Sequence, residues 1–366
     1  CKAREFSAEK AEAREFKRSV PDVRTAFHSM NWRVQYPITI QDEDLRMAFT
    51  SVNGVQDLIA RIVDSVYTAA EYDEYLLFKY LIIKAVSHGK MFPVSFDASN
   101  MSNAAKSFRA VSNQLTFMST KYNDSGVHTT TPRADQYIFM DSTFNAAYDV
   151  DVLAAAFNMD KATFTGNLKL IDDFTTFDND RFSDIMAGSD QIDEVTTAEL
   201  ALMADVKAVL VDKEWFQIYD NQNKMTEKYV ASGEYWNYFY NVWKTVSSSP
   251  FSNAVVFVDS KANVALPASF DAEIVDKSIS DEATVFTLAC GLDNASIAPQ
   301  NIKFEQTEQL TTAGIAVHPY GAIIIPASQA STEITIVGTL NGTKYTGATK
   351  ITSASTVGDK VTMNKG

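Results

Sequence analysis

The chain has 366 residues and a formal net charge of −14, and a chain of this length is expected to form two or three domains with separate cores. The apolar share of 46% excludes a disordered chain, and no run approaches the roughly 18 consecutive apolar residues that a membrane helix needs. All ten arginines lie at or before Arg181, so the second half of the chain has no side chain that binds phosphates or base edges in a bidentate manner.

The N-terminal segment, residues 1–19, mixes lysine, arginine and glutamate, and its two phenylalanines are too far apart to form a core-facing stripe. We expect an extended arm there. The next segment, residues 20–41, has a proline near each end and is rich in β-branched and aromatic residues. This pattern predicts a two-stranded hairpin or a long loop.

A long helix is expected over residues 55–86, after a break at Asn53-Gly54. Apolar residues recur there at helical spacing and then become almost continuous. Thr68, with Glu71 three residues later, fits a helix start, and Gly89 fits a helix end. The part from Thr68 to Gly89 would extend roughly 33 Å at 1.5 Å per residue. A helix of this length can serve as the backbone of a subunit.

The pattern from residue 90 to about residue 259 mixes strands and helices, which indicates an α+β fold. The apolar run at residues 206–211 is typical of a buried strand. Strands are expected at residues 91–96, 136–141, 167–174 and 206–211, and helices at residues 103–115 and 151–157.

An aromatic block, residues 213–259, holds three of the four tryptophans. Within it, Trp236, Phe239, Tyr240 and Trp243 recur at helical spacing, which favours one core-facing helical stripe. The alternative is an exposed platform on which sugars or bases stack. We favour the core interpretation, because burying each ring contributes a few kcal/mol.

The composition changes near residues 260–270: only five aromatic residues lie in the last 100 residues, against 37 before them. Asn341-Gly342 is a strong hairpin signal. We expect an Ig-like β-sandwich over residues 263–366. Its strand candidates are residues 283–292, 314–319, 321–327, 333–340 and 343–352.

The sequence lacks the usual signatures of catalysis. The four histidines have no metal-site spacing, and no nucleotide-binding or nucleophile-elbow motif occurs. Carboxylates cluster between Asp172 and Asp184, but a solvated acidic loop explains them better than a catalytic or calcium site. We expect no enzymatic activity, no cofactor and no bound metal.

Three stretches carry a resemblance to a known family: residues 20–63, which begin VPDVRTAFHSMNWRV, residues 132–160, which begin PRADQYIFMD, and residues 209–258, which begin VLVDKEWFQIYD. Together they are similar to the major capsid proteins of small, short-tailed bacteriophages of Gram-positive hosts. That family has the Hong Kong 97-type (Johnson) capsid fold. The third stretch is the most specific of the three.

The resemblance implies a division of the chain into four parts. Residues 1–19 would be the N-terminal arm and residues 20–41 the E-loop hairpin. Residues 42–262 would form the capsid core, with the long spine helix and the peripheral and axial domains. Residues 263–366 would be the appended Ig-like domain.

The function that the resemblance implies is that of a structural subunit. It would self-assemble into hexamers and pentamers of an icosahedral phage head that encloses double-stranded DNA. Its partners would be further copies of itself, together with portal, scaffolding or decoration proteins. The subunit would assemble in the host cytoplasm and end in the virion. Its negative charge implies only weak contact with packaged DNA, and no membrane contact is expected.

The contacts between subunits are expected to involve the segment at residues 20–41. Charged and aromatic side chains often dominate protein interfaces. We therefore expect Arg24, His28, Trp32 and Arg33 to contact a neighbouring subunit.

Three other functions remain open at this point. The first is an encapsulating shell that stores an enzyme instead of DNA. The second is a secreted cell-surface or carbohydrate-binding protein, although the N-terminal segment lacks the apolar core of a secretory signal. The third is a hydrolase that uses Asp172, Asp173 and Asp180 and binds a divalent metal.

Overall fold

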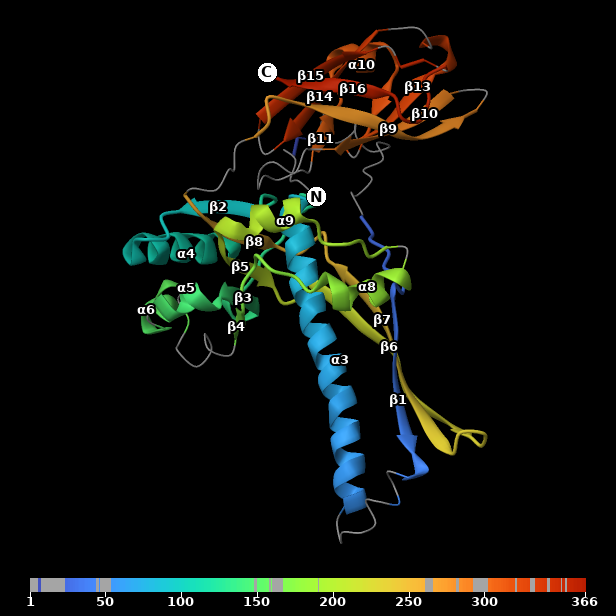
Figure 1. Ribbon diagram of the computed structural model, residues 1–366. Coiled ribbons are helices and arrows are strands. Elements are labelled where there is room, and N and C mark those ends of the chain that lie inside the picture. Colours follow the sequence, from blue (N-terminus) through green and yellow to red (C-terminus); the bar gives the residue numbers. More distant parts are fainter. Residues whose placement is uncertain are drawn as a thin grey trace.

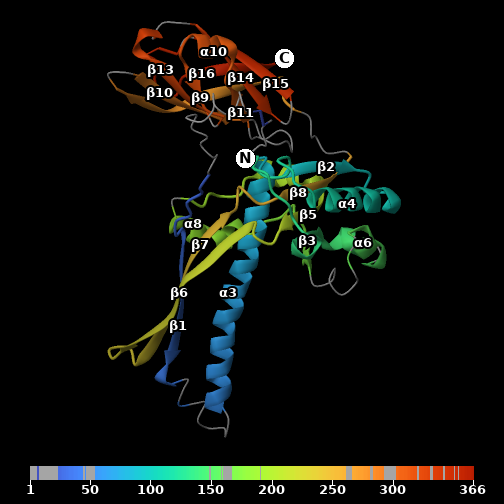
Figure 2. The same ribbon diagram turned by 180° about the vertical axis from the view of Figure 1, so that it is seen from behind.

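The computed structural model places a long central helix between a β-ribbon on one side and a sheet with its own helices on the other, with a separate β-domain beyond the C-terminal end of the helix (Figure 1). The reverse view shows the same order (Figure 2). The described residues are 6–7, 24–43, 46, 54–147, 150–157, 159, 167–189, 191–260, 266–280, 283–291, 302–319, 321–329, 333–340, 343–349, 351–352 and 354–366. The expected arm, residues 1–19, lies outside them except for residues 6–7.

The central helix, α3 (Gly54–Ser87), has 34 residues and extends about 51 Å at 1.5 Å per residue. The expected helix over residues 55–86 is confirmed, but Thr68 does not start a helix, because no glycine or proline interrupts residues 55–88 and α3 runs through Thr68. The expected end is confirmed. Gly89 has a φ of 63°, which glycine adopts without strain, and its amide donates to the Val86 carbonyl.

Five strands form a mixed sheet beside α3, and all four expected strands of this region are confirmed in position. Residues 208–211 are buried on both faces of the sheet, which explains their continuous apolar run. In spatial order the strands are β2 (Phe92–Phe96), β8 (Ala254–Asp259), β5 (Val206–Asp212), β3 (Gln136–Asp141) and β4 (Leu168–Ile171).

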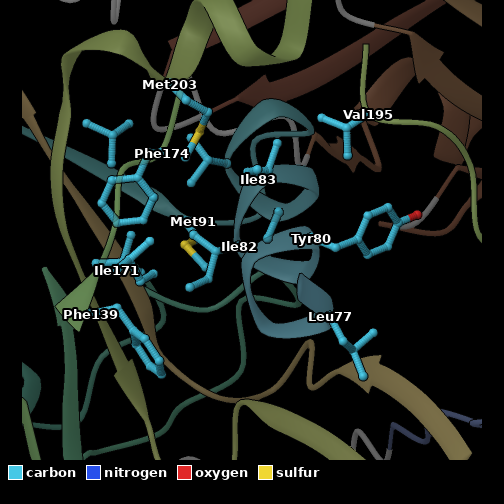
Figure 3. Packing of buried hydrophobic residues seen from close by; sticks show 14 of the residues in the cluster. Leu77, Tyr80, Ile82, Ile83, Met91, Phe139, Ile171, Phe174, Val195 and Met203 are labelled. Atoms are coloured by element: carbon cyan, nitrogen blue, oxygen red, sulfur yellow. The ribbon is translucent and has the colours of Figure 1, made fainter. Parts of the chain in front are cut away.

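Strand alternation divides the side chains of this sheet between two cores. Val209 and Val211 belong to the cluster that packs on α3, whereas Ala208 and Leu210 belong to the cluster on the opposite face. Figure 3 shows the first cluster, in which α3 carries Leu77, Tyr80, Ile82 and Ile83 among side chains from the sheet and loops. The sheet and α3 therefore form one packed body.

Short helices surround this body. The expected helices at residues 103–115 and 151–157 are confirmed as α4 (Met101–Leu115) and α6 (Val150–Ala156). Three further helices were not expected from the sequence: α5 (Ser142–Ala147), α8 (Asn179–Ala187) and α9 (Thr197–Leu202). Two 3₁₀ turns, η1 (Arg133–Asp135) and η2 (Met203–Asp205), lead into β3 and β5.

The ribbon on the other side of α3 has three antiparallel strands in the order β1 (Trp32–Gln41), β7 (Tyr235–Ser248) and β6 (Phe216–Val230). β1 pairs with β7 along its whole length, from Trp32 opposite Lys244 to Gln41 opposite Tyr235. Within the described residues 24–41, the segment does not pair with itself as the expected hairpin. Its partner strand lies about 200 residues away in the sequence.

The ribbon also corrects the interpretation of the aromatic block. Trp236, Phe239, Tyr240 and Trp243 lie on strand β7 and not on a helix. Successive residues of a strand point to opposite faces, so Trp236 and Tyr240 face α3 while Phe239 and Trp243 face away. The four rings therefore do not form one stripe.

The C-terminal part is an all-β domain with its own core, as expected. Its eight strands form one continuous sheet, and the Phe304 amide donates to the Pro319 carbonyl at 3.0 Å, which joins the two ends of that sheet. Leu340 pairs with Thr343, which confirms the hairpin. In spatial order the strands are β11 (Ile302–Glu305), β14 (Ile334–Leu340), β15 (Thr343–Thr349), β16 (Lys360–Lys365), β9 (Ser269–Ile279), β10 (Ala283–Gly291), β13 (Ala322–Pro326) and β12 (Ala316–Val317).

The domain also contains α10 (Glu308–Thr312) and the 3₁₀ turn η3 (Ala327–Gln329). Tyr345 and Phe286 are fully buried in its core, which shares no residue with the two cores beside α3. The Ig-like topology and the boundary at residue 263 stay predictions.

Candidate inter-subunit interface

The segment that precedes β1, residues 24–31, is held against its own subunit by polar contacts. Arg24 donates to the Ser125 carbonyl, and His28 Nδ1 lies 2.6 Å from Ser247 Oγ. The Asn31 side chain donates to the Val246 carbonyl at 2.8 Å and accepts from the Val246 amide at 2.9 Å. The segment is thus fixed on the surface, and His28 is exposed there.

Trp32 has a different environment from the one that the sequence suggested. Only 2% of its surface is exposed, and its ring centroid lies 5.8 Å from that of Phe182. Trp32 lies on the row of β1 that faces α3, so strand alternation directs its ring into the core. A ring in this position stabilises its own subunit and offers no surface to a neighbour.

Arg33, the next residue, points the other way. It is exposed, and its guanidinium carbon lies 4.4 Å from the centroid of the Trp243 ring, a cation–π contact across the ribbon. The structure therefore separates the four expected contact residues. Arg33 and His28 are exposed, Arg24 is half-buried, and Trp32 is buried.

The ribbon face around Arg33 is ordered by side-chain hydrogen bonds. Gln35 Nε2 donates to Asn241 Oδ1 at 2.7 Å, and Thr39 Oγ1 donates to Asn237 Oδ1 at 2.7 Å. These bonds fix the rotamers of alternate residues on the two strands. Such a face can meet a partner with little loss of side-chain entropy.

The opposite ribbon face is joined to α3 by buried polar groups. Asp73 of α3 is 5% exposed, accepts from the Tyr36 hydroxyl at 2.7 Å, and pairs with Arg181 of α8 at 2.5 Å. Burial, followed by the hydrogen bond to the Asp73 carboxylate, raises the pKa of Tyr36 well above its ordinary value. We call this group the first clasp of α3.

A second clasp joins α3 to the other two strands. Lys244 of β7 is 8% exposed and pairs with Glu74 at 2.9 Å and with Asp220 of β6 at 3.2 Å. Burial lowers the pKa of Lys244, but the hydrogen bond and the charge of Glu74 raise it above the ordinary value. Lys244 is therefore a buried ammonium that is held by two carboxylates.

The third clasp joins α3 to the segment after β4. Lys79, which is 2% exposed, pairs with Asp172 at 2.8 Å, and the Tyr75 hydroxyl also donates to Asp172. Burial raises the pKa of Asp172, while the bonds from Lys79 and Tyr75 lower it below its ordinary value.

The fourth clasp lies near the end of α3. Glu199 of α9 is 2% exposed, accepts from Lys84 at 2.9 Å, and accepts from the Thr196 amide at 2.7 Å. Burial raises the pKa of Glu199, but the Thr196 amide and Lys84 lower it below its ordinary value. His88 lies 3.4 Å from the same carboxylate, and burial lowers the pKa of His88.

These clasps were not predicted from the sequence, although a signal was present. Lys79 and Lys84 are charged residues within the apolar stretch at residues 75–86, and charged groups in such positions need partners.

The acidic cluster between Asp172 and Asp184 also has structural roles. Asp173 accepts from the Thr175 and Thr176 amides, and Asp178 caps α8.

Within the described part of the chain, no group of three or more histidine, cysteine or acidic side chains is arranged to hold a metal ion. Among the same residues, no helix is both long and apolar enough to cross a membrane.

A groove of about 620 Å³ opens between α3 and the β3–β4 side of the sheet. Its apolar walls include Tyr75 and Phe78 of α3, Phe139 of β3 and Phe216 of β6. Leu170 at its edge is 53% exposed. The β3–β4 edge of the sheet and the ribbon lie on opposite sides of α3 in both views (Figures 1 and 2), and Phe216 at the start of β6 reaches the groove from the ribbon.

Comparison with known proteins identifies the family. The model of Phi29-like phage major capsid proteins matches residues 1–258. The major capsid protein of Bacillus phage B103 is 37% identical over 260 residues, which cover 69% of this chain and 52% of that protein. The major capsid protein of Bacillus phage GA-1 is 33% identical over 347 residues, which cover 91% of this chain and 66% of that protein. The chain thus spans about half to two thirds of the length of these relatives.

A solved structure agrees on the fold. The capsid structure of Staphylococcus phage Andhra contains a chain with a TM-score of 0.56 and 14% identity to this one, covering 71% of this chain and 78% of that chain. The likeness confirms the Hong Kong 97-type capsid architecture that the resemblance implied. Since the family model covers more than two thirds of the sequence, this chain belongs to the Phi29-like phage major capsid proteins.

Proposed function

We propose that this chain assembles with copies of itself into the hexamers and pentamers of an icosahedral phage head that encloses double-stranded DNA. It acts as a structural subunit without catalysis. Membership of the capsid family supports this function over an enzyme-storing shell, a secreted carbohydrate-binding protein or a metal-dependent hydrolase.

The observation that carries the proposal is the surface area of the isolated subunit. Its accessible surface is 20060 Å² for a mass of 40.5 kDa. A compact monomer of this mass is expected to expose about 14,500 Å². An elongated chain with a separate C-terminal core exposes such an excess of about 5,500 Å², which leaves ample area for neighbours that would each cover roughly 800 Å².

The surface segment around Arg24, His28 and Arg33 is the part that we propose meets a neighbouring subunit. Trp32 supports this contact only indirectly, by fixing β1 to the core. Portal, scaffolding and decoration proteins are further proposed partners, and assembly would take place in the host cytoplasm. The net charge of −14 supports only weak contact with the enclosed DNA.

Electron microscopy of the purified chain tests the proposal directly. Negative-stain images and size-exclusion chromatography over a range of protein and salt concentrations should show rings or closed particles. A chain that stays monomeric at every concentration, in the presence and absence of the proposed scaffolding partner, would refute the proposal.

A further inference from the structure

The C-terminal domain meets the capsid core at strand β11, which lies on the side of that domain facing the capsid core in both views (Figures 1 and 2). Ile302 and Phe304 of β11 point into the hydrophobic core of their own domain, so strand alternation directs Lys303 outward. Lys303 reaches the turn at residues 123–126, because a Cβ atom at Gly126 would overlap its ammonium group. The φ of Gly126 is 59°, a conformation that glycine adopts without strain. The tip of Lys303 therefore lies against the backbone of the capsid core.

A second cation lies at the same turn. Arg24 donates to the carbonyl of Ser125, the residue before Gly126. Because the path from Arg24 through this carbonyl and the Gly126 backbone to Lys303 is short, the two charges lie within roughly 8 Å of each other. Burial, followed by the charge of Arg24, lowers the pKa of Lys303. Two cations therefore converge on one turn at the junction of the two domains.

Among the described residues, no carboxylate offsets the charge of Lys303. The ammonium is half-buried and forms no hydrogen bond or ion pair with any of them. Glu305 shares the outward face of β11 with Lys303, but it pairs with Lys344 at 3.0 Å. Asp124 belongs to the turn itself, where burial raises the pKa of its carboxyl and the charge of Lys90 lowers it in part. Since burial of a charged group costs free energy unless the group is paired, Lys303 is held beside Arg24 at an energetic cost.

We propose that Lys303 and Arg24 bind an oxyanion between them, and that this anion links the C-terminal domain to the capsid core. A phosphate that accepts a hydrogen bond of about 2.8 Å from each side chain spans roughly 8 Å from one nitrogen to the other. This span matches the upper limit of the separation between the two charges. Arginine and lysine are side chains that proteins commonly use to bind phosphate groups. The carboxylate of a second copy presents the same chemistry as a free phosphate, so either can occupy the site.

The bound anion holds the C-terminal domain in place. The domain shares no residue of its hydrophobic core with the two cores beside α3, so surface contacts fix its position. Without an anion, the positive charges of Lys303 and Arg24 repel each other across this junction. An oxyanion converts this repulsion into two charge-assisted hydrogen bonds, whereas sodium chloride screens the two charges without bridging them. The link therefore depends on the kind of anion and not on ionic strength alone. This inference goes beyond the proposed function and does not depend on it.

Acetylation of the lysine side chains tests the site, because mass spectrometry reports on each ammonium separately. The full chain, diluted until it is monomeric, is acetylated in phosphate and in sodium chloride of equal ionic strength. Once phosphate reaches about twice its Kd, it occupies about two thirds of the sites and should lower the acetylation rate of Lys303 about threefold. Lys360, an exposed lysine of the same domain, is the internal control and should react equally in both salts.

A second condition identifies the source of the oxyanion. If Lys303 becomes protected when the concentrated chain assembles in chloride alone, the site takes a carboxylate of another copy; protection by phosphate in the dilute chain assigns it to a free anion. Arg24→Gln should abolish the protection under either condition, whereas Arg24→Lys keeps the charge and should retain most of it. The matched control is Arg61→Gln, which removes an exposed arginine near the N-terminal end of α3 and should leave the protection unchanged. Circular dichroism confirms that each variant is folded.

Equal acetylation of Lys303 in phosphate and in chloride, together with unchanged reactivity on assembly, would overturn the proposed site. Protection that persists in the Arg24→Gln variant would overturn it as well, since the anion would then act elsewhere. The measurements on the dilute chain require no assembly. A chain that never assembles would therefore contradict the proposed function alone, and the comparison of phosphate with chloride in the dilute chain would then decide on the site.

Discussion

Replacement of Trp32 by alanine should destabilise the capsid core of the isolated subunit. The ring is 2% exposed and packs on Phe182 and the core beside α3. Burial of an aromatic side chain removes 150–250 Å² from water, which at about 25 cal/mol per Å² corresponds to about 4–6 kcal/mol. Measured losses for replacement of a buried tryptophan by alanine are about 3–5 kcal/mol. We expect a loss of about 4 kcal/mol for Trp32→Ala.

Urea unfolding followed by tryptophan emission can measure this loss. The other three tryptophans lie at or before residue 243 and none lies in the C-terminal domain, so the signal reports the core alone even without Trp32. Arg33→Ala is the matched control, because the exposed contact with Trp243 contributes only about 0.5–1 kcal/mol. The protein must be dilute enough to be monomeric. A Trp32→Ala subunit within 1 kcal/mol of wild type would refute the assignment of Trp32 to the core.

Three further predictions concern the clasps and the C-terminal domain. Glu199→Gln should lower the free energy of unfolding by about 2–3 kcal/mol near pH 7. Because the folded pKa of Glu199 is lowered, the wild-type advantage is complete above roughly pH 5 and declines as the pH falls through the folded pKa. Urea titrations that show a constant difference between the two proteins down to pH 3 would contradict this prediction. Tyr36→Phe removes one hydrogen bond to Asp73 and should cost about 1 kcal/mol in the same assay. A loss indistinguishable from zero would show that this bond does not help hold the ribbon on α3. Deletion of residues 266–366 should leave the core folded with an unchanged far-ultraviolet helical signal from α3, because the two regions share no core residue; loss of that signal would show that the core depends on the deleted domain.

Local sequence patterns predicted the parts of the fold that depend on local physics. The strand at Gln136–Asp141 has the bounds that its composition indicated, and the end of α3 at Gly89 follows from the left-handed conformation that glycine adopts there. The pairing of Leu340 with Thr343 follows from a two-residue turn signal. In each case the residues that determine the structure are neighbours in the sequence.

The ribbon could not be predicted in this way, because its strands are distant in the sequence. β1 pairs with β7 about 200 residues later, and no pattern within residues 20–41 specifies that partner. The spacing of Trp236, Phe239, Tyr240 and Trp243 suggested a helix, but the dense aromatic residues around them favour a strand. Trp32 was expected at an interface because the sequence does not show which face of β1 is buried. That face is determined by β7 and α8, which are distant in the sequence.

The clasps fix α3 in one position between the ribbon and the sheet. Buried ion pairs add little stability, because desolvation offsets most of the attraction, but each pair accepts only one arrangement of its partners. Asp73 and Glu74 fix α3 to the ribbon, and Lys79 fixes it to the segment after β4. A slide of one helical turn would leave the buried charges of Asp73, Lys79 and Lys244 unpaired, whereas a purely apolar contact would tolerate such a slide. The ribbon and the sheet therefore keep one position relative to α3, as identical subunits of a closed ring require.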